Sequence, residues 1–178
     1  MDQLPPGTRV PTMWRSTKTY GHEEGLSCCF RQWRATHSHC RKLHGYALAF
    51  RLGFASEVLD EHHWCFDFGG LKPVKAWLHE MFDHTTLVAA DDPELAEFER
   101  LAARDLIDLR ILPAVGCEAT ARYAFGHISE FVATATAGRV WLDEVEVREH
   151  SGNSAIFSCP GFRNQQFGLM APAINREA

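Results

Sequence analysis

Large apolar side chains alternate with smaller ones along residues 44–54, and this pattern constrains the fold more than any other. The even positions carry the large groups: Tyr46, Leu48, Phe50, Leu52 and Phe54. A period of two places successive large side chains on the same face of a strand. The segment therefore predicts a strand with one buried face, and the same parity places His44 at the beginning of that face.

Two helical patterns and several shorter strand patterns surround this strand. Apolar residues recur at helical spacing over residues 71–82 and again over 117–134, which predicts two amphipathic helices. Residues 26–33 and 64–68 are short apolar segments, and residues 139–157 alternate again, so strands are expected at all three places. The short connections favour an α+β fold, in which an antiparallel sheet carries helices packed on one face.

The chain of 178 residues is expected to form one domain, since domains of roughly 100 to 150 residues are the most common. Residues 1–24 lack a period, so they are expected to be an irregular lead-in. The domain is expected over residues 25–157, with Asp92 and Pro93 opening a helical insertion at about 92–112. Residues 158–178 are expected to be a loosely held tail.

The charge and the composition argue against several classes of partner and location. The net charge is −5 and the pI is about 6.0, so no general attraction to nucleic acid or to an anionic membrane is expected. No run approaches the roughly 20 apolar residues of a spanning helix, and the first residues lack the pattern of a signal peptide. Six cysteines are too few for a disulfide scaffold at this length, so the predicted location is the reducing cytoplasm.

Three histidines and a cysteine gather in the loop before the main strand and at its first residue. They are His37, His39, Cys40 and His44, within eight residues. Such side chains bind zinc or act as nucleophile and base; the alternative is a cysteine that fills the core and histidines that face water. The basic residues around them are Arg31, Arg34, Arg41 and Lys42. A basic setting favours the thiolate form of a cysteine and attracts anions, which favours a functional interpretation.

Two further places carry acidic candidates. Asp83 and His84 close the first predicted helix, where an aspartate could orient a histidine; adjacent residues rarely form that pair, and a helix cap with a solvated acid is the alternative. Glu149 shares the apolar parity of the last strands, so its carboxylate needs hydrogen-bond donors. A ligand with a flat N–H edge would supply two donors, and an arginine at the edge of the sheet is the alternative.

Five ordered motifs match one family. They are CRKLHGY, DFGGLK, FDHTTL, VGCE and VREH, spread over about residues 26–157. In these motifs the chain resembles the family of 6-pyruvoyl-tetrahydropterin synthase and of the bacterial 6-carboxytetrahydropterin synthase of 7-deazaguanine and queuosine biosynthesis. The resemblance implies a T-fold, whose subunits join sheet edge to sheet edge into a homo-oligomeric barrel with active sites between subunits.

The resemblance also implies roles for individual residues. Cys40 would be the thiolate acid and base, and Asp83 with His84 would complete a proton relay. Glu149 would anchor the pterin ring, and Glu118 matches a helix-starting glutamate at the substrate site. The implied activity is that of a lyase that releases triphosphate from 7,8-dihydroneopterin triphosphate while a zinc ion acidifies the hydroxyls of the substrate.

The zinc ligands depart from the pattern of the family. The resemblance implies three histidines, one on the first strand and two in a His-Gly-His turn, and only His44 is clearly retained. Tyr46 stands at the second histidine of the turn. Phe30 or, in another register, Arg34 stands at the first-strand position.

Two interpretations of this departure are open. Either His37 or His39 joins His44 in a rebuilt zinc site, with Cys40 as a further ligand, or the metal is lost; we expect the rebuilt site. The Pro-Thr motif has become residues 115–117, without the hydroxyl that would face the pterin. The alternative functions are a re-purposed, non-catalytic T-fold protein that binds a pterin- or purine-like ring without metal chemistry, and a zinc-stabilised interaction domain.

Overall fold

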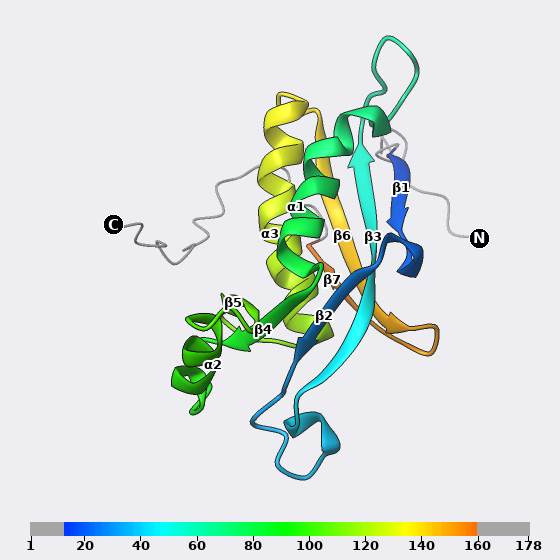
Figure 1. The fold of residues 1–178 in the computed structure, drawn as a ribbon. Helices are drawn as coiled ribbons and strands as arrows, with labels where there is room; N and C mark the ends of the chain where they lie inside the picture. Colours follow the sequence, from blue (N-terminus) through cyan, green and yellow to red (C-terminus); the bar gives the residue numbers. More distant parts are fainter. Residues whose placement is uncertain (1–12, 160–178) are drawn as a thin grey trace, which may run out of the picture.

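The strand expected at residues 44–54 lies at the centre of the sheet as β3 (His44–Ser56). The structure is a computed structural model that describes residues 13–159. β2 (Leu26–Phe30) pairs antiparallel with the beginning of β3, and β1 (Trp14–Tyr20) pairs antiparallel with its second half. On its other side β3 pairs antiparallel with β6 (Val140–His150), which in turn pairs with β7 (Asn153–Ser158) (Figure 1).

The sheet is mixed, which corrects the expectation of a purely antiparallel one. β4 (Thr85–Ala89) is parallel to β2, and β5 (Asp108–Leu112) is parallel to β4. Parallel neighbours need crossover connections, and helices supply them: α1 (Lys72–Phe82) precedes β4, and α2 (Leu95–Ala102) links β4 to β5. The order of the sheet is therefore β5-β4-β2-β3-β6-β7, with β1 beside β3.

Two helices, α1 and α3 (Cys117–Ala135), cover one face of the sheet (Figure 1). That face carries the even-numbered apolar residues of β3 that the alternation predicts: Leu48, Phe50, Leu52 and Phe54 are buried, and Tyr46 is partly buried. The ring of Phe50 lies 5.0 Å from that of Phe82 on α1, measured between centroids. Burying one such side chain stabilises the fold by about 1.5–3 kcal/mol, so this core holds both helices against the sheet.

Three local expectations differ from the structure. β1 lies in the segment expected to be irregular, because its small polar residues carry no apolar period. The segment 64–68, expected to be a strand, is irregular and leads into a short 3₁₀ helix at Phe68–Leu71, which begins where the Asp67 carboxylate accepts a hydrogen bond from the backbone N–H of Gly69 at 2.8 Å. The insertion expected to be helical at about 92–112 is helical only at α2, and its last residues form β5.

Two further 3₁₀ helices, His22–Glu24 and His39–Arg41, complete the elements of the described chain. Between residues 13 and 159, no helix has the length and apolar character that crossing a membrane requires. Residues 1–12 of the expected lead-in and residues 160–178 of the expected tail lie outside the described residues.

Candidate functional site

Three rings, those of Phe30, His44 and Tyr46, meet where β2 pairs with the beginning of β3. Phe30 and His44 are direct partners in the antiparallel register, and Tyr46 follows on the same face of β3. The centroid of the His44 ring lies 5.2 Å from that of Phe30 and 5.4 Å from that of Tyr46. His150, at the end of β6, adds a fourth ring at 6.3 Å from Tyr46. These four rings are called the aromatic cluster below.

Glu149, beside the aromatic cluster, contacts the beginning of α3. The Cys117 thiol donates a hydrogen bond to the Glu149 carboxylate. Burial, together with the negative charges of Glu149 and Glu118, raises the pKa of Cys117 to about 12. The thiol is therefore protonated at neutral pH and serves as a neutral donor. The arginine partner considered for Glu149 is not found within residues 13–159, since the Glu149 carboxylate takes part in no ion pair there.

Tyr46 is the side chain on which the candidate groups converge. Burial raises the pKa of Tyr46, and the negative charges of Glu149, Cys40 and Cys117 raise it further, in that order. All three groups therefore lie within electrostatic range of one phenol. Cys40 and Glu149, which lie 109 positions apart in the sequence, therefore both lie within electrostatic range of the Tyr46 phenol.

The loop that carries Cys40 is tied to the beginning of α3 through Gln32. The backbone N–H of Gln32 donates to the carbonyl of Cys40 at 2.8 Å. The Gln32 side chain lies against Gly116, where an added Cβ would overlap its amide nitrogen. Gly116 also has a φ of 105°, which L side chains rarely adopt, so glycine is required at this close approach. Glu118, two residues on, is exposed in the first turn of α3.

A basic hollow of about 280 Å³ lies next to Cys40. It is lined by Arg31, Trp33, Thr36, Arg41 and Lys42. Arg31 donates to both carboxylate oxygens of Asp92, at 2.8 and 2.5 Å, and is thereby neutralised. Arg41 and Lys42 are exposed, and in the described chain neither is in an ion pair. These two residues leave the hollow with a net positive charge suited to an anionic group.

Asp83 and His84 form the direct pair that adjacent residues rarely make. His84 Nδ1 lies 2.5 Å from Asp83 Oδ1, in a geometry that the left-handed φ of His84, 57°, makes possible. His79 Nδ1 lies 3.3 Å from the other carboxylate oxygen. The hydrogen bond to His84, followed by that to His79, lowers the pKa of Asp83. The His84 imidazole is therefore oriented by a carboxylate, and its ring is largely exposed.

The Asp83–His84 pair is separate from the aromatic cluster in this chain. Within residues 13–159, no hydrogen bond, ion pair or ring contact joins either residue to Cys40, Tyr46 or Glu149. The structure therefore gathers the candidate residues in two places, one around Tyr46 and one at the end of α1.

His37 and His39 are exposed on the loop before β3 and do not form a ligand group with His44. His44 Nδ1 lies 2.7 Å from the carbonyl oxygen of Lys42, so this nitrogen carries the proton and only Nε2 has a free lone pair. The residues predicted for zinc therefore do not fit a zinc ion in the arrangement of this chain, because their donor atoms are not gathered.

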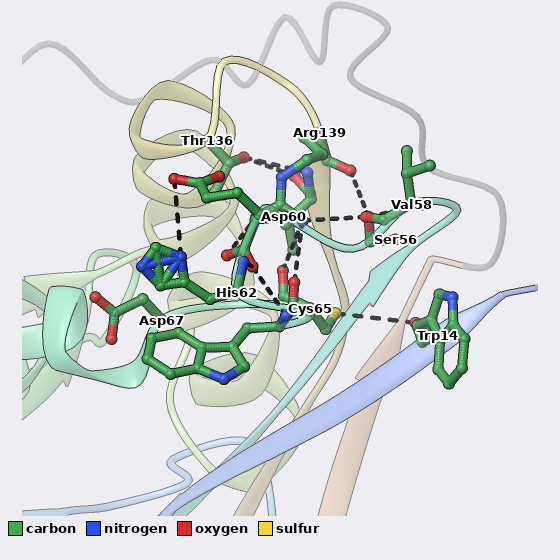
Figure 2. Close-up of polar contacts among 12 residues, drawn as sticks. Trp14, Ser56, Val58, Asp60, His62, Cys65, Asp67, Thr136 and Arg139 are labelled. Carbon is green, nitrogen blue, oxygen red and sulfur yellow. Dashed lines mark hydrogen bonds and ion pairs between the residues drawn. The ribbon is translucent and has the colours of Figure 1, made fainter.

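The part of the chain that the structure describes holds one group of three potential ligands whose donor atoms lie within 4.8 Å of one another: Asp60, Glu61 and His62. These residues lie on the loop after β3 (Figure 2). The Asp60 carboxylate accepts the backbone N–H groups of His62 and Trp64, at 2.9 and 2.8 Å, and faces Arg139 at 3.6 Å. These bonds order the loop, so Asp60 has a structural role.

Sequence reasoning gave no role to His150 or Cys117 at this site. His150 follows the last buried position of β6 and shows no period of its own, so only the position of β6 beside Tyr46 reveals it. Cys117 could have been found from its position, because the residue after a glycine that begins a helix lies at the N-terminal end of the helix, where acidic partners are favoured.

The comparisons with known proteins identify the family of the chain. The model of the family described as 6-pyruvoyl tetrahydropterin synthase matches residues 20–159, which include both groups of candidate residues. The chain belongs to this family. A 6-carboxy-5,6,7,8-tetrahydropterin synthase of Rickettsia felis is 34% identical over 59 residues, a match that spans 33% of this chain and 43% of that protein.

Solved structures of the synthase family share the fold. The 6-pyruvoyltetrahydropterin synthase of Plasmodium vivax aligns over 82% of this chain and 97% of its own, with a TM-score of 0.60 and 14% identity. An uncharacterized protein of Wolinella succinogenes aligns over 83% of this chain and 98% of its own, with a TM-score of 0.69 and 17% identity. At these identities the likeness supports the α+β fold of the synthases.

Proposed function

We propose that this synthase-family member is a pterin-processing lyase that acts on 7,8-dihydroneopterin triphosphate and releases triphosphate, as 6-pyruvoyl- and 6-carboxytetrahydropterin synthases do. The observation that carries the proposal is the packing of the His44, Tyr46 and His150 rings beside Glu149, with Cys40 in electrostatic range of Tyr46, in a chain of this family. An acid, a thiol and aromatic rings in one place are the groups needed to hold a flat nitrogen heterocycle and move a proton on its side chain.

Glu149 would bind the ring of the pterin. A carboxylate offers two acceptor oxygens in one plane, which match the paired N–H groups at the edge of a pterin. The Cys117 thiol donates to the same carboxylate and leaves acceptor positions free for the ligand. The neighbouring rings of the aromatic cluster would pack against the face of the heterocycle. Glu118, exposed in the first turn of α3, is a second acidic group for the ring.

Cys40 would transfer protons at the side chain of the substrate. Its thiol is exposed, near the Tyr46 phenol and next to the basic hollow. Asp83 and His84 would complete the relay, and because they lie apart from Cys40 in one chain, we propose that a neighbouring subunit supplies them. This makes the protein a homo-oligomer with sites between subunits, in which the free edges of the sheet would pair.

The basic hollow supports a substrate that carries phosphate groups. Arg41 and Lys42 face it without ion-pair partners in the described chain, next to the proposed acid–base Cys40. A triphosphate leaving group would be bound there by charge, while the ring lies against the aromatic cluster. The zinc ion implied by the resemblance has no gathered set of donors in this chain, so no step is assigned to it here.

The test is incubation of the purified protein with 7,8-dihydroneopterin triphosphate, with and without added zinc, and measurement of released triphosphate. Release by the wild type that disappears in Cys40→Ala supports the proposal. A Cys159→Ala variant, which removes a cysteine of the last described residues, is the matched control. No release under either metal condition would remove the lyase proposal.

A second function has a specific observation in its favour. Phe30 and Tyr46 stand where the family resemblance implies histidines, and Tyr46, packed on the buried Phe30 ring, presents a partly exposed aromatic side chain beside Glu149. This supports a re-purposed protein that binds a pterin- or purine-like ring without catalysis. Binding of a pterin measured by fluorescence, with no turnover of the triphosphate substrate, would favour this function over the lyase.

A further inference from the structure

The sheet register decides which residues occupy the three positions that the resemblance assigns to zinc. Phe30 is the direct partner of His44, and Tyr46 follows on the same face. Arg34, the alternative for the first position, lies on the loop beyond β2, where its guanidinium is bound to the Asp91 carboxylate. The three positions are therefore Phe30, His44 and Tyr46.

These three side chains supply too few donors for zinc. Zinc sites in proteins take three or four donors at about 2.0–2.3 Å, from histidine, cysteine or carboxylate. The phenyl ring of Phe30 has no donor atom. His44 has one, Nε2, because Nδ1 is bonded to the carbonyl of Lys42. A tyrosine phenol is ordinarily protonated at neutral pH, and a protonated phenol is a poor zinc ligand.

Nearby residues do not complete the set. Cys40, Cys117, Glu149 and His150 surround Tyr46, yet within residues 13–159 no three potential ligand atoms in this region lie within 4.8 Å of one another. The Cys117 thiol is committed as a donor to Glu149. Rings cover this face of the paired strands β2 and β3 instead, with centroids 5.2 to 6.1 Å apart.

We infer that aromatic side chains occupy the metal position in this chain, and that its site engages a flat heterocyclic ligand through His44 and the Tyr46 hydroxyl without zinc, with the buried Phe30 ring packed behind them. In the described chain the Tyr46 hydroxyl has no hydrogen-bond partner, so it is free to bind a polar group of the ligand. The inference deepens the proposed function, because it concerns the cofactor of the same site, and it is tested by a measurement independent of turnover.

The experiment measures zinc binding by the purified full chain. The protein is stripped with a chelator and titrated with zinc in competition with a chromogenic chelator, and bound zinc is then counted by elemental analysis. The wild type is expected to hold less than about 0.1 zinc per chain, since too few donors are present. Phe30→His/Tyr46→His restores three imidazoles on one face and is expected to hold about one zinc per chain.

Two controls assign the metal to this site. Adding His44→Ala to the double variant is expected to abolish the gained zinc. Ile111→His, at an exposed position of the edge strand β5, is expected to gain none, which excludes an effect of any added histidine. Circular dichroism checks that each variant folds. If the double variant does not fold, the zinc content of the wild type and of its His44→Ala variant still tests whether the chain binds zinc through His44.

The opposite result is a wild type that binds about one zinc per chain and loses it with His44→Ala, and it would overturn the inference. Failure of this inference can be distinguished from failure of the proposed function. Triphosphate release that requires zinc bound through His44 would remove the inference and keep the lyase. Absence of release from a wild type that binds no zinc would remove the lyase and leave the inference in place.

Discussion

Glu149 shows what strand parity can and cannot predict about a single residue. Val145 and Val147 are buried, and Glu149, two positions on, is the partly buried acid that the alternation indicates. The contact of Glu149 with the Cys117 thiol could not be predicted from the sequence, because the two residues come together only when the beginning of α3 packs beside the end of β6. The odd or even position of a residue along a strand therefore predicts the face of the sheet on which its side chain lies, whereas the residue that it contacts there depends on tertiary packing.

Replacing Glu149 by glutamine is expected to weaken binding of a pterin by roughly tenfold to a hundredfold, because hydrogen bonds to a charged group contribute about 1.5–3 kcal/mol. The amide keeps the shape of the side chain but loses the charge and one acceptor. Fluorescence titration of the protein with the pterin measures the affinity. Glu130→Gln, at an exposed position of α3, is the matched control and should bind like the wild type. Equal affinity in Glu149→Gln would contradict the anchoring role.

The cysteines are expected to differ strongly in their reaction with iodoacetamide. Burial raises the pKa of both Cys28 and Cys117 to about 12, whereas Cys40 is exposed. Only the thiolate reacts, and at pH 8 a thiol of pKa 12 is ionised in about one molecule in 10⁴. Peptide mass spectrometry at pH 8 should find Cys40 labelled well before Cys28 and Cys117. The unfolded protein should lose this order; labelling of native Cys117 as fast as Cys40 would contradict the buried hydrogen bond.

At the scale of elements, the strength of the apolar period decides what could be predicted. β3 has large apolar residues at every second position, and α3 repeats them at helical spacing, so both were predictable close to their observed bounds. β1 has polar residues on both faces, and β4 has five buried residues in a row, so neither shows a period. The parallel pairing of β4 and β5 depends on a crossover helix, and the alternation of apolar and polar residues along a strand does not predict whether its neighbour is parallel.

The pair of Arg31 and Asp92 joins the end of β2 to the segment before α2, and breaking it is expected to destabilise the protein. Asp92 is buried and accepts two hydrogen bonds from Arg31. Asp92→Asn should lower the free energy of unfolding by about 1–3 kcal/mol, because it leaves a partly buried guanidinium without its charge partner. Denaturant unfolding at pH 7 measures this. Asp91→Asn, which breaks an exposed pair with Arg34, should cost less than about 1 kcal/mol.

The effect of Asp92 is also expected to depend on pH. The hydrogen bonds from Arg31 lower the pKa of Asp92 below its usual value. A lowered pKa in the folded state contributes stability that is present above the pKa of the unfolded chain, about 3.9, and is lost as the pH falls through the folded value. The difference in stability between wild type and Asp92→Asn should therefore shrink below pH 4. A difference that stays constant down to pH 2 would contradict the charge pair as its source.

At the scale of the whole molecule, the candidate residues form two groups that make no direct contact with each other in the described chain. The mixed α+β sheet with helices on one face was predictable in class, and five sequence motifs indicated the family before any coordinates. The lack of direct contact between the Asp83–His84 pair and Cys40 was not predictable, because motifs order residues along the chain and do not say which of them meet in space. Within the described residues, β1, β5 and β7 each leave one edge of the sheet unpaired.

Activity is expected to be shared between subunits, and complementation of two inactive variants measures this. Cys40→Ala and His84→Ala should each lack triphosphate release. When the two differently tagged chains are co-expressed and the mixed oligomer is purified through both tags, a site with Cys40 from one subunit and His84 from the next is intact in about a quarter of random pairings. Release at about a quarter of the wild-type rate is therefore expected from the mixed oligomer. If the mixed oligomer releases no more triphosphate than either single variant, Cys40 and His84 act from the same chain. A wild type that is monomeric by light scattering would exclude a site shared between subunits.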